Sequence, residues 1–295
     1  MITKTLTGIA LFDEQYEGIY RGRAMLACGR CGAGKTIFGL QFIRQGLRQG
    51  ERCLMYSARP PAELVIYAEA MGIPIGEAVT RGYLILLEYR EDAPARSRAE
   101  DRALPPDGFL QLQQIIDTNA IQRVVLDTTL PWVAIRSQTN LAEHVFSFVR
   151  SFDRLDMTTL LTIPKPVSPM ACNLRNAIEK IVPVSVMMNF DPESGKRFFK
   201  VRKYLGKQEL FPETEYAIIP RTGIAKIDPV QPPRMAQPAA AAPEARVKPS
   251  FRSLIPNAVS SGSTPDASGA TNPPAPGKIR FSSVIPATVR QQASI

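Results

Sequence analysis

The sequence predicts an α/β fold built on a mainly parallel β-sheet. Short apolar runs, typical of buried strands, alternate along the chain with segments in which apolar residues recur at helical spacing. A glycine-rich loop joins the first long apolar strand to the helix that follows it. Later in the chain, the turn sequence Asp191-Pro192-Glu193-Ser194-Gly195 separates two strand-like runs. This turn predicts a hairpin that adds antiparallel strands to the edge of the sheet.

The individual elements follow from the same patterns. Apolar strands are expected at residues 23–28, 52–57, 83–89, 123–127, 158–163, 183–189 and 197–204. Helices are expected from residue 37 to the glycine at 46, and at about 61–71, 109–118 and 141–153. The stretch 91–108 is polar, carries mixed charge and contains prolines, so we expect it to be a solvated excursion.

Residues 29–36 carry the strongest functional signal. They read Gly29-Arg30-Cys31-Gly32-Ala33-Gly34-Lys35-Thr36, a complete G-x-x-x-x-G-K-[ST] phosphate-binding loop between a strand and a helix. The glycines let backbone N–H groups turn toward an anion, and the helix adds its positive N-terminal end. Lys35 is expected to reach the outer phosphates, and the Thr36 hydroxyl to bind Mg²⁺. The alternative is a structural glycine turn, but the matching flanks favour nucleotide binding.

Asp127 is the expected second ligand of the magnesium ion. It ends the apolar strand 123–127, the pattern of a carboxylate that holds Mg²⁺ through water opposite Thr36. The alternative is an aspartate that only caps a strand end, and the presence of Lys35 upstream favours the metal role. ATP and Mg²⁺ are therefore the expected cofactors.

The composition of the chain changes abruptly near residue 230. Residues 231–295 are mainly Pro, Ala, Ser and Gly, and bury too little apolar surface to offset the entropy of ordering. We expect one folded domain over residues 1–230 and a disordered tail over residues 231–295. The tail has seven basic and two acidic residues, so it carries a net charge of +5 out of the chain's +9. The folded part is therefore only mildly basic, which is weak support for nucleic-acid binding.

Other features narrow the class of protein. No apolar run has the length of a membrane span and no signal-peptide pattern is present, so a cytoplasmic location is the default expectation. Four cysteines are too few for a disulfide scaffold of this size. Cys28 and Cys31 form a C-x-x-C pair that would close the loop if oxidised, but one core cysteine and one tolerated loop cysteine are the favoured interpretation. His144 has no partner in the sequence, and such a histidine is more often packed than catalytic.

From its opening segment to its final hairpin, the sequence resembles the KaiC family, a branch of the RecA-like ATPases. The resemblance covers residues 4–227 and rests on Thr7-Gly8-Ile9 with Phe12-Asp13, Arg21-Gly22, the phosphate loop, Leu40-Gln41-Phe42 with Gly50-Glu51, Asp127, and the hairpin with its Lys203-x-x-Gly206 exit. It implies a RecA-like P-loop core that assembles into a ring, usually a hexamer, with ATP at the subunit junctions.

Two positions depart from what the resemblance implies. After the second strand, the family usually has two acidic residues that polarise the attacking water, and here the positions hold Ala58 and Arg59, which cannot accept its proton. At the end of the hairpin, the family tends to have a Lys-x-Arg pair that reaches the γ-phosphate of the neighbouring subunit. In this chain Lys203 occupies the lysine position of that pair, but the arginine position is occupied by Leu205. Arg202 could replace that arginine only if the strand register slips.

These departures predict a protein that binds ATP but hydrolyses it poorly. A missing base costs on the order of 10²–10⁴ in rate, and a missing arginine finger on the order of 10³–10⁵. Glu63 in the first turn of the next helix, or Glu51, could take over as base, so an active ATPase motor or switch is one alternative. A recombination protein that holds DNA is a second alternative, and its affinity would fall steeply with salt.

The tail contains one motif twice. Residues 251–259 read F-R-S-L-I-P-N-A-V and residues 281–289 read F-S-S-V-I-P-A-T-V, so the pattern F-x-S-[LV]-I-P-x-x-V recurs after thirty residues. Apolar islands in disordered segments commonly bind partner proteins, and duplication of a neutral linker is the alternative. The residues expected to bind a partner are Phe251, Ile255, Pro256, Val259, Phe281, Ile285, Pro286 and Val289.

Overall fold

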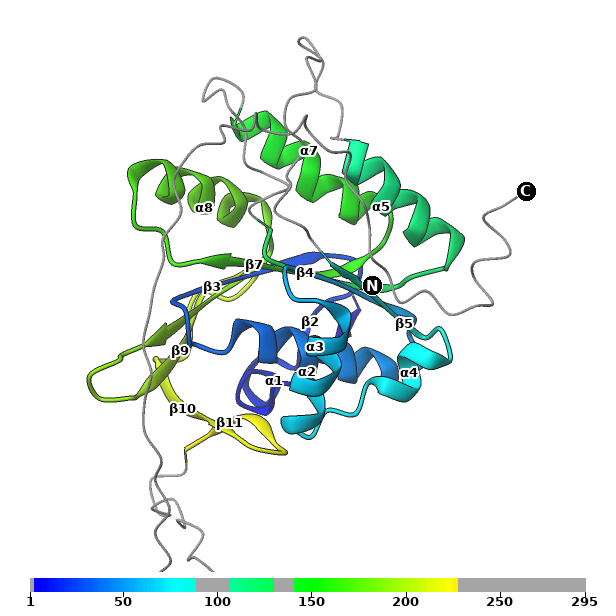
Figure 1. The fold of residues 1–295 in the computed structure, drawn as a ribbon. Helices are drawn as coiled ribbons and strands as arrows, with labels where there is room; N and C mark the ends of the chain where they lie inside the picture. Colours follow the sequence, from blue (N-terminus) through cyan, green and yellow to red (C-terminus); the bar gives the residue numbers. More distant parts are fainter. Residues whose placement is uncertain (1–2, 89–106, 130–140, 228–295) are drawn as a thin grey trace, which may run out of the picture. The chain divides into compact units, whose positions relative to one another are not determined.

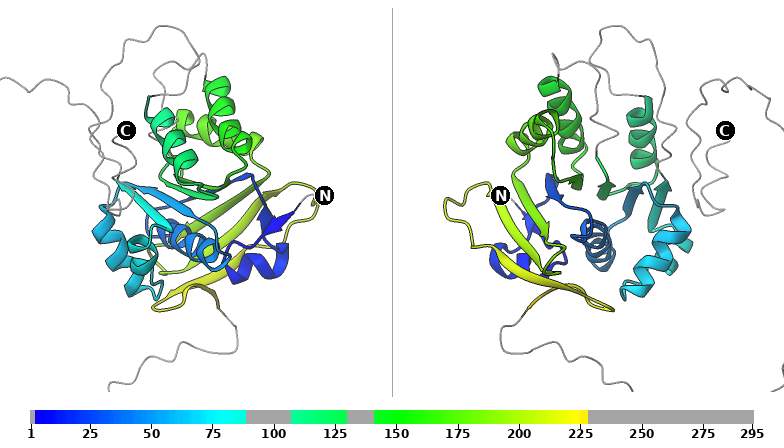
Figure 2. Two further views of the ribbon diagram at one scale, coloured as in Figure 1. Left: turned by 90° about the vertical axis from the view of Figure 1, so that its right-hand side faces the viewer. Right: turned by 60° about the vertical axis from the view of Figure 1, so that its left-hand side comes forward.

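A computed structural model describes residues 3–88, 107–129 and 141–227 of the chain. In these ranges a β-sheet lies between two layers of helices, as Figures 1 and 2 show, so the expected α/β fold with a mainly parallel sheet is confirmed. The expected tail at 231–295 and the excursion up to residue 106 lie outside the described residues. None of the described helices is both long enough and apolar enough to cross a lipid bilayer.

The main sheet has nine strands within the described ranges, in the order β11-β10-β9-β8-β3-β7-β6-β4-β5. The run from β8 to β5 is parallel, and β9, β10 and β11 extend one edge in antiparallel fashion. The strands are β3 (Ala24–Gly29), β4 (Cys53–Ser57), β5 (Leu84–Glu88), β6 (Arg123–Asp127), β7 (Thr158–Pro164), β8 (Val184–Phe190), β9 (Arg197–Tyr204), β10 (Thr214–Ile219) and β11 (Gly223–Lys226). The short strands β1 (Lys4–Thr5) and β2 (Ile19–Tyr20) form a separate antiparallel pair.

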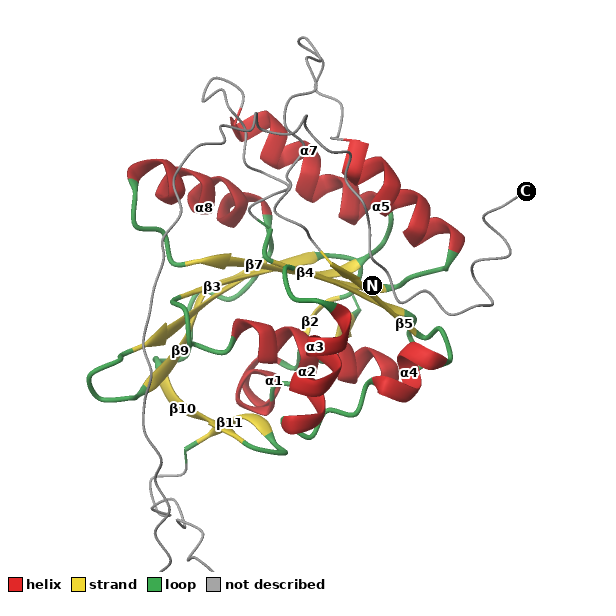
Figure 3. Cartoon of the chain, in the orientation of Figure 1, coloured by secondary structure: helices red, strands yellow, loops and turns green. Residues whose placement is uncertain are grey.

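The helices divide between the two faces of the sheet (Figure 3). One layer contains α1 (Ala10–Tyr16), α2 (Lys35–Arg48), α3 (Pro61–Ala70) and α4 (Gly76–Thr80), and the other contains α5 (Asp107–Thr118), α7 (Leu141–Arg154) and α8 (Pro169–Ile181). Each layer covers its own hydrophobic cluster: Met25 and Ala27 of β3 face α2, whereas Leu26 and Cys28 face the helices of the other layer. Because both faces are covered, the parallel strands are apolar at nearly every position.

The expected strands are all present, with ends within one or two residues of their predicted positions. The sequence analysis missed α1, α4, α8, the β1–β2 pair and the β10–β11 hairpin. For α8 a signal existed, because Ser168 caps the helix by accepting a hydrogen bond from the Ala171 N–H at 3.2 Å and Pro169 occupies its first turn. The strands β1 and β2 contain only two residues each, too few for an alternating pattern to appear.

A candidate nucleotide-binding site

The phosphate loop lies at the carboxyl ends of the parallel strands, between the end of β3 and the start of α2. Gly32 and Gly34 have φ values of +80° and +90°, a backbone conformation that residues with a Cβ rarely adopt. The loop therefore requires glycine at both positions. Gly34 is the N-cap of α2 and provides no side-chain cap, which leaves the first N–H groups of a 14-residue helix available to an anion.

The antiparallel strands hold this loop in place from outside. Arg197 at the start of β9 donates from Nε to the Gly32 carbonyl at 3.0 Å, and the Tyr216 hydroxyl of β10 donates to the Ala33 carbonyl. The Phe190 ring packs against Gly32, where an added Cβ would come within 3.1 Å of it. These bonds hold the carbonyls of Gly32 and Ala33 toward the antiparallel strands, while the Ala33 N–H donates to the Arg30 carbonyl within the loop at 3.3 Å. Sequence reasoning missed all three residues.

Lys35 begins α2 and turns back over the loop. Its Nζ donates to the carbonyl oxygens of Gly29 and Arg30, both at 2.9 Å. Burial lowers the pKa of Lys35, and the negative charge of Asp127 opposes this shift. The amine is therefore held among neutral carbonyl acceptors at the place where the outer phosphates are expected.

The structure brings together the two residues predicted to bind magnesium, although 91 positions separate them. The Thr36 hydroxyl donates to Asp127 Oδ2 at 2.8 Å, and the Thr162 hydroxyl of the neighbouring strand β7 donates to Asp127 Oδ1 at 2.9 Å. A hydroxyl and a carboxylate are the hard oxygen donors that Mg²⁺ takes, alongside water and phosphate oxygens. The described residues include no cluster of three or more His, Cys, Asp or Glu side chains that could hold a metal without phosphate.

Ala58 and Arg59 follow β4, next to Asp127. Ser57 pairs with Asp127 in the sheet, and the Ala58 N–H donates to the Asp127 carbonyl at 3.3 Å. Arg59 is exposed, with its guanidinium 5.4 Å from the centre of the Tyr67 ring on α3. The two residues after β4 are thus an exposed alanine and an exposed arginine, and neither carries a carboxylate.

Two nearby glutamates lie at the same edge of the sheet. Glu63 is exposed in the first turn of α3, as expected, so it stays a candidate base. Glu88 ends β5 and pairs in register with Ser57, one strand farther from the phosphate loop than Ala58. The sequence analysis did not single out Glu88, although it ends an apolar strand as Asp127 does.

Glu51 lies at the opposite edge of the sheet, and the alternative in which it acts as base is wrong. Its carboxylate pairs with Nε of the fully buried Arg123 at 2.5 Å and with Arg21 at 2.9 Å. Arg123 is the first residue of β6 and Asp127 the last. At about 3.3 Å per residue, the two ends of this strand are roughly 13 Å apart, so Glu51 cannot approach a phosphate at the loop.

Lys203 and Arg202 also lie far from the phosphate loop of their own chain. Lys203 pairs with Ser185 near the start of β8, whereas the loop end of β3 pairs with the end of β8. The register shifts there, because Val201 pairs with Val186 and leaves Arg202 as an extra residue. Strand β9 therefore has a bulge at Arg202, and the replacement of the missing arginine by Arg202 stays a prediction.

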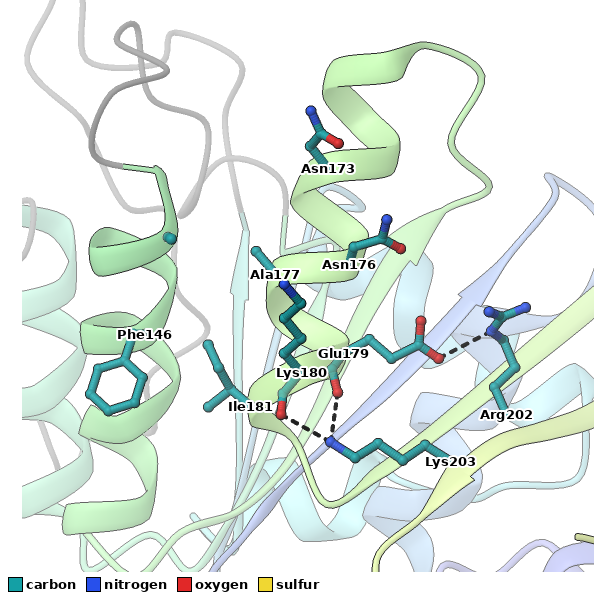
Figure 4. A pocket seen from close by; sticks show the side chains of 10 residues that line it. Phe146, Asn173, Asn176, Ala177, Glu179, Lys180, Ile181, Arg202 and Lys203 are labelled. Carbon is teal, nitrogen blue, oxygen red and sulfur yellow. Dashed lines mark hydrogen bonds and ion pairs between the residues drawn. The ribbon is translucent and has the colours of Figure 1, made fainter.

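The bulge brings both basic side chains to α8, as Figure 4 shows. Lys203 Nζ donates to the carbonyls of Glu179 and Lys180 at 2.8 and 3.0 Å, and Arg202 Nε pairs with the Glu179 carboxylate at 3.0 Å. They line a groove bordered by α7, α8 and β9. Within this chain Lys203 caps the C-terminal end of α8, so a contact between Lys203 and a nucleotide would have to involve another subunit.

The cysteines differ in their surroundings. Cys28 is buried, burial raises its pKa to about 11, and its thiol contacts the Pro164 carbonyl at 3.6 Å. Cys31 is exposed in the phosphate loop. These positions fit the interpretation of one core cysteine and one loop cysteine, and the redox alternative stays untested. His144 is half-buried on α7, on the face of the sheet opposite α2.

Comparisons with known proteins agree with this geometry. The family model described as "ATPase: KaiC" matches residues 5–230. The circadian clock oscillator protein KaiC of Acaryochloris marina is 24% identical over 226 residues, which are 74% of this chain and 42% of that protein. KaiC of Thermosynechococcus vestitus is 34% identical over 136 residues, 42% of this chain and 26% of that protein. The chain thus spans less than half the length of these curated relatives.

A solved structure supports the fold independently. The KaiC-like protein from the hyperthermophilic archaeon Pyrococcus horikoshii superposes with a TM-score of 0.62 at 19% identity, covering 77% of this chain and 100% of that one. At this identity the likeness establishes the RecA-like fold rather than an activity. Because the family model covers well over half of the sequence and includes the phosphate loop, Asp127 and the final hairpins, this chain belongs to the KaiC ATPase family.

Proposed function

We propose that this chain binds ATP with Mg²⁺ through residues 29–36 and Asp127, hydrolyses it slowly or not at all, and uses the bound nucleotide to control its own assembly. The observation that carries the proposal is the 2.8 Å hydrogen bond between Thr36 Oγ1 and Asp127 Oδ2 at the N-terminal end of α2. It joins a hydroxyl and a carboxylate beside the loop that would hold the phosphates. When bound, Mg²⁺ would neutralise charge on those phosphates.

Slow hydrolysis follows from the residues at the end of β4. Ala58 and Arg59 occupy the place beside Asp127 where a base is required, and neither can take a proton from water. Glu63 is exposed in the first turn of α3, so it is the candidate whose removal must be tested. Because the Arg202–Lys203 pair lies at the far edge of the sheet, it could act only on the nucleotide of a neighbouring subunit.

Assembly and partner recruitment complete the proposal. In a ring, the phosphate-loop edge of one subunit would face the Lys203 edge of the next, which explains why the loop and Lys203 lie at opposite ends of the strands. The repeat at residues 251–259 and 281–289 would bind a partner protein in the cytoplasm. The relatives are named for the circadian clock, but this chain spans less than half of them, so the proposal is limited to nucleotide-controlled assembly.

The nucleotide part is tested by a binding titration beside a turnover assay. Full-length protein is titrated with a fluorescent ATP analogue in the presence and absence of Mg²⁺. Lys35→Ala should weaken binding strongly because it removes the positive charge expected at the outer phosphates. If Lys35→Ala binds the analogue as tightly as the wild type, the assignment is wrong.

Turnover at saturating ATP tests the slow-hydrolysis part. The double variant Ala58→Glu/Arg59→Glu should hydrolyse ATP faster than the wild type, since it supplies carboxylates beside Asp127. Brisk wild-type turnover that collapses in Glu63→Gln would instead establish an active ATPase with Glu63 as its base.

Co-purification tests the tail. Two motif copies on one flexible chain raise the effective concentration for a partner with two sites, with avidity gains of roughly 10²–10⁴. Phe251→Ala or Phe281→Ala alone should weaken recovery of the partner, and the double variant should abolish it while ATP binding is unchanged. Equal recovery by the double variant and the wild type would show that the repeat is linker.

A further inference from the structure

Arg59 is fixed at the edge of the sheet that carries the phosphate loop. Its backbone N–H donates to the Ser57 hydroxyl at 3.2 Å, and Ser57 pairs in register with Asp127. The residue between them, Ala58, is hydrogen-bonded to the Asp127 backbone. Arg59 therefore follows directly after the two residues that are bonded to or paired with Asp127, and these contacts determine where its backbone leaves the sheet.

The side chain of Arg59 is held on the α2 side of the sheet. Its guanidinium lies 5.4 Å from the ring centre of Tyr67, a residue that packs against the hydrophobic cluster shared with α2. Burial raises the pKa of the Tyr67 phenol, the positive charges of Arg59 and Arg197 oppose this shift, and the negative charge of Asp127 adds to it. Arg197 itself contacts the phosphate loop, at the Gly32 carbonyl.

Three positively charged side chains around the loop form no ion pair with a carboxylate of the described residues. Within the parts of the chain that the structure describes, no carboxylate forms an ion pair with Arg59, Arg197 or Lys35. Lys35 and Arg197 donate to backbone carbonyls, and Arg59 contacts an aromatic ring. Other arginines of the domain, such as Arg123, pair with a glutamate. The cations at the loop are therefore available to an anion larger than a single carboxylate.

We propose that Arg59 binds the terminal phosphate of ATP and thereby makes the site distinguish ATP from ADP. The inference rests on the proposed function, since it requires a nucleotide at residues 29–36. The planar guanidinium can donate two parallel hydrogen bonds to phosphate oxygens. An arginine at the end of β4 then stabilises the bound triphosphate, at a position where it cannot activate water. Arg59 is thus a specificity-determining residue.

The test compares ATP and ADP affinities of full-length variants, measured with Mg²⁺ by displacement of a fluorescent nucleotide. Arg59→Ala should weaken ATP binding about 10- to 100-fold, the range for a lost hydrogen bond to a charged group. ADP affinity should change less than about twofold. The matched control is Arg52→Ala, because Arg52 is also exposed, lies 5.9 Å from the ring centre of Tyr83 and adjoins the other end of β4. Its ATP and ADP affinities should stay at the wild-type values.

The possible outcomes separate the two proposals. Lys35→Ala should lower the affinity for both ATP and ADP. If that variant keeps the wild-type affinities, the proposed nucleotide site is refuted. Equal losses of ATP and ADP affinity in Arg59→Ala, or no loss of either, would overturn the role of Arg59 and leave the site intact. Arg59 is exposed, so Arg59→Ala should unfold at the wild-type temperature. A wild-type ATP-to-ADP preference that survives in Arg59→Ala would also overturn the inference.

Discussion

Replacing Glu51 by glutamine tests whether this glutamate stabilises the fold or acts as a catalytic base. The Glu51 side chain is 4% exposed and its carboxylate pairs with the guanidinium of Arg123, which is 0% exposed. Glutamine has nearly the same shape as glutamate but no charge. The substitution therefore leaves the Arg123 cation buried with weakened compensation, because the remaining acceptors of Arg123 are neutral.

The expected cost follows from the groups that remain. Breaking a buried ion pair by removing one partner costs about 3–5 kcal/mol. Arg123 keeps hydrogen bonds to the carbonyls of Leu6 and Phe42, and to the side chains of Thr5 and Gln49. These contacts place Glu51→Gln at the low end of the range, about 3 kcal/mol. For a domain of this size, that corresponds to a fall in melting temperature of roughly 6–12 °C.

Urea denaturation followed by circular dichroism measures the change in unfolding free energy. The matched control is Glu77→Gln, because Glu77 forms an exposed pair with Arg81 at 2.8 Å and should cost less than about 0.5 kcal/mol. At temperatures where both variants are folded, Glu51→Gln should retain wild-type ATP affinity and turnover. A stability loss below about 1 kcal/mol, or turnover that falls while stability is unchanged, would refute the reasoning.

Three further outcomes are expected at the loop. A maleimide should label the exposed thiol of Cys31, with ATP slowing the reaction, while Cys28, with its pKa near 11, should stay unlabelled at about pH 8 when read by mass spectrometry. Thr162→Val removes one hydroxyl from Asp127 and should weaken Mg²⁺-dependent ATP binding about fivefold while leaving Mg²⁺-free binding unchanged. Arg197→Ala frees the Gly32 carbonyl and should weaken ATP and ADP alike, about tenfold by calorimetry, in contrast to Arg59→Ala.

The part of the site that the sequence predicts is the part encoded locally. Residues 29–36 combine a strand end, glycines that accept positive φ and a helix start, so eight consecutive residues determine the loop. The contact between Thr36 and Asp127 was also predictable, because the carboxyl ends of parallel strands meet at one edge. The family resemblance supplied the further expectation that the carboxylates after β4 are missing.

The remaining contacts depend on chain segments that no local pattern connects. Arg197 and Tyr216 contact the loop from 165 and 183 positions away, through strands whose pairing is fixed only by the folded sheet. Glu51 was mistaken for a candidate base because a polar residue before a strand looks exposed in sequence. Its burial depends on Arg123, 72 positions later. The extra residue at Arg202 did leave a trace in the sequence, because two basic residues in a row, Arg202-Lys203, interrupt the alternation of β9 between Val201 and Tyr204.

In our proposal, the residues at both edges of the sheet favour binding of ATP over its hydrolysis. At the loop edge, Arg59 would add attraction for the terminal phosphate where a carboxylate would promote its transfer. At the opposite edge, Arg202 is paired with Glu179 and Lys203 caps α8, so both cations already have partners before any neighbour approaches. On the proposed function, the ATP state then ends by dissociation of the nucleotide more often than by hydrolysis. Such a protein responds to the ratio of ATP to ADP around it, and a residue that discriminates between the two nucleotides determines how sharply the assembly follows that ratio.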